Sequence, residues 1–226
     1  MKVKNKVVIR VVAVILLLFV LCYIYLFTGA KIKNAGSEVI KGDNGTKSLV
    51  VYFTRQGEIP GEVDAVSSAT PNSNKEMKGS DTQAAARMIQ SVTGADMYQI
   101  YTDHYYRKSF MGTAATAWLE NTLNLRPKLA AKPDNLDQYD IIYIGYPIWW
   151  FNAPMAVGSF LESYDLSGKT VVPFCTSQDN DISVSMDYIQ KAAKGATVPD
   201  GYRIHGADLD DVREWLKGIA DWPIEK

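Results

Sequence analysis

The chain contains little cysteine, little histidine and almost no net charge. Its 226 residues include two cysteines and two histidines, and the formal charge is −1 at pH 7. Because Cys22 lies in an apolar run and Cys175 follows a buried-strand pattern, we expect no internal disulfide. His104 and His205 stand apart from other metal-binding side chains, so the sequence predicts no metal site. The balanced charge, without a basic patch, also argues against a nucleic-acid partner.

A single long apolar run lies near the amino terminus. Residues 11–27 form this run, which follows four basic residues and is close to the length needed to span a bilayer. A cleavable signal peptide, with its cleavage site at 28–30, is the alternative. The length of the run favours an uncleaved anchor over residues 1–30. The basic residues before the run outnumber those just after it, which places the amino terminus in the cytoplasm and the folded domain outside the cell membrane.

The remainder of the chain is expected to be one domain behind a short connection. Residues 31–47 are read as a polar linker and residues 48–226 as the folded domain. Within the domain, short apolar runs alternate with helical patterns. We predict strands at 48–53, 97–101, 141–146, 170–176 and 202–205, and helices at 81–92, 113–123, 154–164, 182–193 and 209–219. This alternation predicts an α/β fold with a parallel sheet covered by helices on both faces.

The segment 140–154 carries the strongest functional signal. A continuous apolar strand pattern at 141–146 ends at Pro147 and is followed by Trp149 and Trp150 on a loop. In an open α/β sheet, the loop after a central strand lies at the carboxyl edge, where ligands bind. Two adjacent tryptophans cannot easily point into one core, so we expect at least one to face a flat, apolar ligand such as a flavin. The alternative is that both are ordinary core aromatics.

Five stretches of the chain resemble flavodoxin-like domains of the bacterial redox type. They are residues 50–55, 145–150, 153–155, 160–162 and 166–174. The resemblance implies a doubly wound five-stranded sheet with strand order 2-1-3-4-5, a bound FMN, and electron transfer that sometimes involves quinones. It covers roughly the whole chain beyond the apolar run.

The resemblance also implies which residues contact FMN. Phosphate would lie at a helix amino terminus after the first strand, where free N–H groups and the helix dipole favour an anion. The implied phosphate-side residues are Thr54, Arg55, Gln56, Ser80, Asp81 and Thr82. The implied ring-side residues are Pro147, Ile148, Trp149, Trp150, Phe151, Asn152, Thr176 and Ser177. The chain departs from the family by a long insertion between 57 and 79 and by Asp81, which replaces an amide; the alternative is that Ser80 or Asp81 only caps the helix.

The insertion contains a second motif. Residues 63–70 resemble the Asp-x-x-Ser/Thr-Gly-Ala-Thr signature of extracytoplasmic redox proteins, except that Ser68 stands at the glycine position. In those proteins the final threonine carries FMN through a phosphoester bond, which implies covalent attachment at Thr70 here. The alternative is a flexible lid made of small residues.

Together these features predict an outward-facing, membrane-anchored domain that binds FMN and transfers electrons. Its redox partner, a quinone or another electron carrier, is not identified by the sequence, and no residue is an obvious catalytic acid. Two alternatives stay open: an NAD(P)H- or quinone-dependent flavin reductase, and a binding module that has kept the fold and lost FMN.

Overall fold

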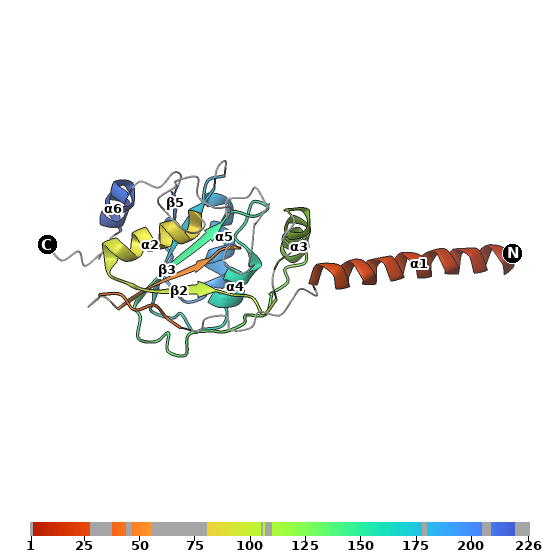
Figure 1. Ribbon diagram of the computed structural model, residues 1–226, viewed down its shortest axis with the longest axis horizontal. Helices are drawn as coiled ribbons and strands as arrows, with labels where there is room; N and C mark the ends of the chain where they lie inside the picture. Colours follow the sequence, from red (N-terminus) through yellow and green to blue (C-terminus); the bar gives the residue numbers. More distant parts are fainter. Residues whose placement is uncertain are drawn as a thin grey trace.

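A five-stranded parallel sheet forms the centre of the protein. The computed structural model describes residues 2–27, 38–43, 47–55, 81–104, 106, 110–177, 180–204 and 209–219. The strands are β1 (Ser48–Phe53), β2 (Asp96–Ile100), β3 (Ile141–Pro147), β4 (Thr170–Thr176) and β5 (Tyr202–Ile204). They pair in the order β2-β1-β3-β4-β5, all parallel (Figure 1). The predicted fold class and strand order are confirmed.

Four helices cover the two faces of this sheet. Helices α2 (Asp81–Thr93) and α6 (Leu209–Gly218) pack on one face, and α4 (Met155–Leu161) and α5 (Ser183–Ala192) pack on the other. Successive side chains of β1 alternate between the two cores, since a strand has a period of two. With both faces covered, the central strands β1, β3 and β4 have almost no solvent-facing side, which explains why their sequences are largely apolar.

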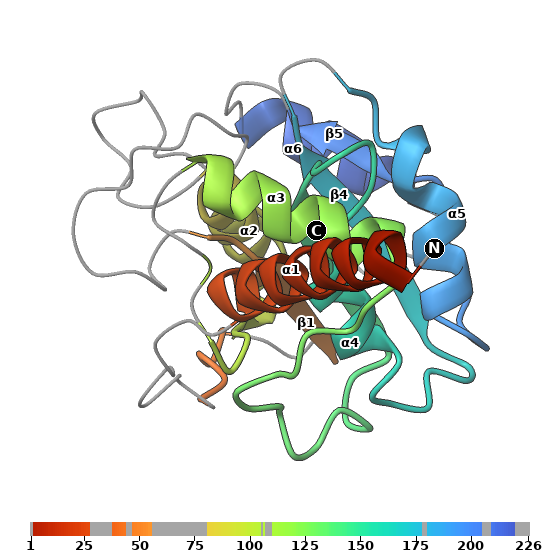
Figure 2. The same ribbon diagram turned by 90° about the vertical axis from the view of Figure 1, so that its right-hand side faces the viewer.

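Helix α3 (Phe110–Thr122) occupies a different position from the other helices. It lies at the end of the sheet that faces α1 (Figures 1 and 2). It begins three residues before the predicted start at 113, because Gly112 is accommodated in the buried side of the helix and does not interrupt it. After α3 the chain returns along β2: Asp103 N–H donates to the Lys128 carbonyl at 2.8 Å, and Ala130 N–H donates to the Tyr101 carbonyl at 2.9 Å.

Helix α1 (Lys2–Phe27) extends away from the domain as a separate rod (Figure 1). Its segment Lys6–Ile24 is long and apolar enough to cross a membrane, and none of it is buried in the protein. Its carboxyl end packs against α3. A signal sequence near an amino terminus can also contain an apolar helix that meets these criteria.

Part of the expected linker is built into the edge of the sheet. Ile40 exchanges two backbone hydrogen bonds of 2.8 Å with Met97 of β2. The Asp96 carboxylate accepts hydrogen bonds from Lys41 Nζ at 2.8 Å, from Gly42 N–H at 2.9 Å and from the Tyr139 hydroxyl at 2.6 Å. These partners outweigh the opposing effect of burial and lower the pKa of Asp96. Residues 38–42 therefore hold the start of the domain against β2.

We predict that replacing Gly145 by alanine destabilises the domain. A Cβ at this position would overlap the ring of Phe174, which is fully buried beneath α2 and α6 and has little room to move. Overpacking of this kind costs on the order of 1–3 kcal/mol. Thermal unfolding followed by circular dichroism should show a lower Tm for Gly145→Ala. In the control Gly218→Ala, the added Cβ meets no atom within 4 Å, so the Tm should be maintained. An unchanged Tm in Gly145→Ala would contradict this account of the core.

Candidate functional site at the carboxyl edge of the sheet

The loops after β1, β3 and β4 meet at the carboxyl edge of the sheet. β1 leads to β2 on one side, whereas β3 lies on its other side, so the strand order reverses between β1 and β3. A reversal of this kind opens a crevice in which ligands of doubly wound folds bind. The predicted site residues Thr54, Pro147 and Thr176 lie at the ends of β1, β3 and β4, and the strand order brings these three ends side by side.

Buried hydroxyl groups converge where α2 begins. The Thr82 and Thr176 hydroxyl oxygens lie 2.7 Å apart, which joins the first turn of α2 to the end of β4. Thr54 and Ser177 are also buried, and the Ser177 Oγ accepts a hydrogen bond from Asn180 N–H at 2.9 Å. Free N–H groups at a helix amino terminus and neighbouring hydroxyl groups are donors suited to an anion.

Arg55 adds a positive charge at the end of β1. The residue follows Thr54 directly and is almost completely buried. A guanidinium ion is a permanent cation that binds phosphate or carboxylate groups through several N–H donors. Together with the amino terminus of α2, it favours an anion at this part of the edge.

Several predicted residues fall outside the part of the chain that the structure describes. These are Gln56, Ser80 and the proposed attachment residue Thr70. Asp81 is the first residue of α2, but its side chain also lies outside the described part. Their predicted roles rest on the sequence alone.

The tryptophan loop is a tight turn with a strained backbone. Trp149 N–H donates to the Asn152 carbonyl at 2.8 Å, and Asn152 N–H donates to the Trp149 carbonyl at 3.1 Å. The two residues between them, Trp150 and Phe151, have φ angles of 51° and 58°. Left-handed backbone costs an L-residue roughly 1–2 kcal/mol, and bulky side chains rarely adopt it. Strain of this kind gathers at ligand-binding sites. The loop therefore marks this edge independently of its composition.

The two tryptophans have different environments. Trp149 is 8% exposed and makes edge-to-face contacts with Phe53 and Tyr106, each at 5.4 Å between ring centroids. Trp150 is 47% exposed, and Phe151 is also exposed. One tryptophan is thus in the core, and the other is accessible together with Phe151. Whether Trp150 faces a flavin stays a prediction.

The remaining ring-side residues support the same loop. Pro147 is buried at the end of β3, and Ile148 N–H donates to the Thr176 carbonyl at 3.2 Å. The Asn152 side chain accepts a hydrogen bond from Ala153 N–H at 2.9 Å and donates one to the Asn121 side chain at 3.1 Å. These bonds attach the loop to β4 on one side and to α3 on the other.

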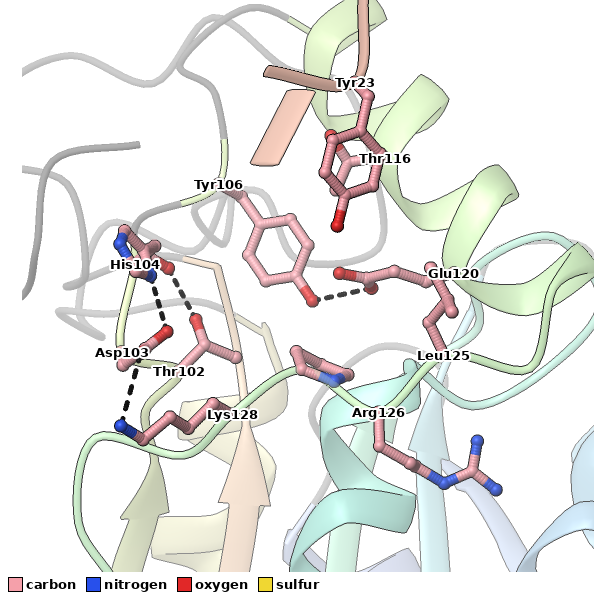
Figure 3. A pocket seen from close by; sticks show the side chains of 11 residues that line it. Tyr23, Thr102, Asp103, His104, Tyr106, Thr116, Glu120, Leu125, Arg126 and Lys128 are labelled. Carbon is pink, nitrogen blue, oxygen red and sulfur yellow. Dashed lines mark hydrogen bonds and ion pairs between the residues drawn. The ribbon is translucent and has the colours of Figure 1, made fainter. Parts of the chain in front are cut away.

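A cavity of about 270 Å³ lies beside this edge (Figure 3). It is lined by the loop after β2, by α3 and by the chain that follows α3. The Tyr106 hydroxyl donates to the Glu120 carboxylate at 2.9 Å inside it. The Tyr106 ring, which lines the cavity, also contacts Trp149. The cavity and the tryptophan loop are therefore separated only by the Tyr106 side chain. The cavity-lining residues are Tyr23, Thr102, Asp103, His104, Tyr106, Thr116, Glu120, Leu125, Arg126, Pro127 and Lys128.

Glu120 is a site residue that the sequence reasoning missed. It is 4% exposed, and burial raises its pKa to about 7, although the hydrogen bond from Tyr106 acts in the opposite direction. A carboxyl group with this pKa gains and loses its proton near neutral pH, as groups at functional sites often do. One feature of the sequence could have indicated this residue: Glu120 is the only ionisable residue in the segment 110–122.

We predict that Glu120 makes the stability of the domain depend on pH. A carboxyl group whose pKa is higher in the folded chain binds its proton more tightly there than in the unfolded chain. Its contribution is complete below pH 4.5 and is lost as the pH rises through about 7. Over that interval Glu120 should lower the free energy of unfolding by on the order of 3 kcal/mol. Chemical denaturation at several pH values should show that Glu120→Gln removes this part of the pH dependence.

The exposed Glu214 supplies the control for this measurement. It lies on α6, where Lys217 Nζ contacts it at 2.6 Å at the surface. Glu214→Gln should therefore leave the fall in stability between pH 4.5 and 7 in place. Equal pH profiles for the original chain and Glu120→Gln would show that Glu120 stays ionised in the folded protein.

Comparison with known proteins agrees with this fold. The chain matches the family model described as Flavodoxin over residues 76–219. A candidate flavoprotein from Bacteroides uniformis ATCC 8492 is 30% identical, with 77% of this chain and 99% of that chain covered and a TM-score of 0.61. Another from Bacteroides eggerthii DSM 20697 is 29% identical, with 77% and 98% covered and a TM-score of 0.61.

A flavoprotein from Lactobacillus acidophilus NCFM, solved in complex with FMN, shares the fold. It is 17% identical, with 75% of this chain and 98% of that chain covered and a TM-score of 0.55. No curated protein matches the chain. The family match covers the larger part of the sequence, and the resemblance noted in the sequence is confirmed. The chain belongs to the flavodoxin family.

Proposed function

We propose that the protein binds FMN at the carboxyl edge of its sheet and serves as a membrane-anchored electron carrier. One observation carries the proposal: the buried hydroxyl groups at the start of α2 and the strained tryptophan loop lie at the same carboxyl edge, where the strand order reverses. This arrangement offers an anion site and a flat apolar surface on one edge. The solved relative from Lactobacillus acidophilus, which has the same fold, is a complex with FMN.

The phosphate end of FMN fits the donors at α2. Thr54 and Thr82 supply hydroxyl groups, the first turn of α2 supplies backbone N–H groups, and Arg55 supplies a positive charge. None of these groups needs to lose a proton to bind a phosphate dianion. They would hold the phosphate, and they would set the end of the cofactor against the sheet.

The ring end fits the tryptophan loop. Trp150 and Phe151 present exposed aromatic surface, and Trp149 holds the loop from the core side. Thr176 ends the neighbouring strand β4, Ser177 follows it, and both would contact the polar side of the ring system. The ring would cover part of the apolar surface that is otherwise left in water.

FMN, when bound, supplies one- or two-electron transfer, and the protein supplies orientation and electrostatics. Trp150 and Phe151 would exclude water from one side of the ring. Glu120, hydrogen-bonded to Tyr106, can hold or release a proton near neutral pH next to the loop. A carrier and a reductase with its own substrate would use the same cofactor site, and steady-state turnover distinguishes them.

We predict that the purified protein shows flavin absorbance or acquires it when FMN is added. Replacing Thr82 by valine removes a hydrogen-bond donor to a charged group, so FMN affinity should fall about tenfold to a hundredfold. Replacing Trp150 by alanine removes aromatic contact and should weaken binding up to about tenfold. Quenching of flavin fluorescence on titration measures both effects.

Thr93→Val provides the matched control because Thr93 lies at the other end of α2, where its hydroxyl accepts Ala95 N–H at 3.0 Å. Its FMN affinity should equal that of the unchanged chain. A protein that stays colourless with added FMN would support the alternative of a binding module without FMN.

Coexpression of the chain with a flavin transferase tests the covalent attachment predicted at Thr70. A fluorescent band on a denaturing gel should be present for the original chain and absent for Thr70→Ala.

The proposal includes α1 as an uncleaved membrane span with the domain outside. The apolar segment Lys6–Ile24 supports this, as does the exposure of its side chains in the protein. We predict that the full chain stays in the membrane fraction after an alkaline carbonate wash and keeps the mass of residues 1–226.

A labelling experiment tests the side of the membrane on which the domain lies. A cysteine placed on α6 by Asp211→Cys should react with a membrane-impermeant maleimide added to intact cells.

The mass and the labelling distinguish an anchor from a signal peptide and an outer domain from a cytoplasmic one. A mass that lacks about the first 30 residues would identify a signal peptide instead of an anchor. Labelling of Asp211→Cys only after cell lysis would place the domain in the cytoplasm and reverse the topology. Cys22 and Cys175 are the background, and the reaction of the unchanged chain is subtracted.

A further inference from the structure

Helix α3 has no exposed charge. Its sequence, Phe110–Thr122, contains one ionisable residue, Glu120, and that residue is buried on the domain side. The opposite side exposes Met111, which is 72% accessible, together with Trp118 and Thr122. The outward side of a surface helix is normally polar or charged, because it faces water. The outward side of α3 is suited to a less polar environment.

Exposed apolar side chains gather on and beside α3. Among the described residues outside α1, eight large apolar side chains are exposed, and six of them belong to this helix, its carboxyl end or the tryptophan loop. We call these six residues the α3 patch: Phe110, Met111, Trp118, Leu123, Trp150 and Phe151. The other two exposed side chains, Ile40 and Val184, lie elsewhere, so the apolar exposure is concentrated in one region.

Hydrogen bonds join the two parts of the α3 patch. The Trp150 indole Nε1 donates to the Ala114 carbonyl of α3 at 2.8 Å. The Asn121 side-chain amide donates to the Trp150 carbonyl at 3.2 Å. The loop is therefore fixed to the helix, and the patch is one surface. Trp150 keeps its indole N–H hydrogen-bonded while part of its ring stays accessible.

Helix α3, which carries most of the patch, packs against the carboxyl end of the apolar helix α1. Tyr23 of α1 lines the same cavity as Thr116 and Glu120 of α3 (Figure 3). Tyr23 is the next-to-last residue of the segment that is long and apolar enough to span a membrane, Lys6–Ile24. If that segment crosses a bilayer, Tyr23 lies at the boundary between lipid and water, where tyrosine and tryptophan are enriched. Its contact with α3 then holds the patch at the same level.

We propose that the α3 patch docks on the lipid surface of the membrane that α1 spans, with its aromatic side chains at the level of the headgroups. The proposal rests on the anchoring proposed above. The bilayer is favoured over a protein partner because the contact between α1 and α3 already brings the patch to it. Uncharged helix faces with tryptophan, phenylalanine and leucine bind at this depth. The docked domain turns the rim of the FMN site, Trp150 and Phe151, toward the lipid.

Spin labels on the full chain in lipid nanodiscs test the docking. With Cys22→Ser as the background, nitroxides are attached at Met111→Cys in the patch, at Leu17→Cys in α1 and at Asp211→Cys on α6. Collision with oxygen, which concentrates in lipid, is compared with collision with a water-soluble nickel chelate. We expect the ratio of oxygen to nickel collisions at Met111→Cys to be several-fold higher than at Asp211→Cys, and lower than at Leu17→Cys.

A second variant shows that the patch itself causes the docking. Trp118 is half exposed, so Trp118→Asp should leave the fold unchanged, which circular dichroism checks. A charge at that position should lower the ratio at Met111→Cys toward the value at Asp211→Cys. Because Leu17→Cys should be unaffected, this loss separates docking from anchoring.

The remaining outcomes overturn one proposal or the other. A water-like ratio at Met111→Cys with a lipid-like ratio at Leu17→Cys would mean that the chain is anchored but the patch does not dock. Protection of Met111→Cys from both reagents would indicate a second copy on the patch and would also overturn lipid docking. A water-like ratio at Leu17→Cys would refute the anchoring itself.

Discussion

Strands β1 and β3 are covered by helices on both faces, and the rest of the structure depends on this constraint. With α2 and α6 on one side and α4 and α5 on the other, neither face has room for a ligand. Only the ends of the strands remain accessible. The reversal of strand order between β1 and β3 separates the connections there, so the carboxyl edge is the part of the sheet where a crevice forms.

The same constraint explains how the tryptophan loop is built. β3 ends inside a filled core, and Trp149 continues that core by packing against Phe53 and Tyr106. The chain must then reverse at once to start α4, so Trp150 and Phe151 adopt left-handed backbone and expose their side chains. Core packing on one side of the loop thus supports aromatic exposure on the other. Adjacent residues thus serve stability and the proposed contact with the flavin.

Helix α3 connects the proposed cofactor site with the proposed membrane anchor. Its inner side buries Glu120, which can exchange a proton near neutral pH, and its outer side is apolar and uncharged. Tyr23 of α1 lies against the same cavity. A carrier arranged in this way would meet its redox partner at the level of the bilayer. Electrons would then travel a short distance between the flavin edge and a redox partner, a quinone or another electron carrier, at that level.

The sequence by itself determined most of the strands and helices, because residues 49–53, 141–146 and 171–175 are largely apolar, which is typical of strands in a sheet that is buried on both faces. It also indicated that the candidate ligand site lies at the carboxyl edge of the sheet, through the turn residues that follow β3 and through the family resemblance. The assignment of Trp149 to the core and Trp150 to the surface needed the tertiary structure, since adjacent residues on a loop have no fixed periodicity. The Thr82–Thr176 contact joins positions 94 residues apart. The burial of Glu120 depends on the packing of Tyr106 and α1 around it, and neither contact is local in the sequence.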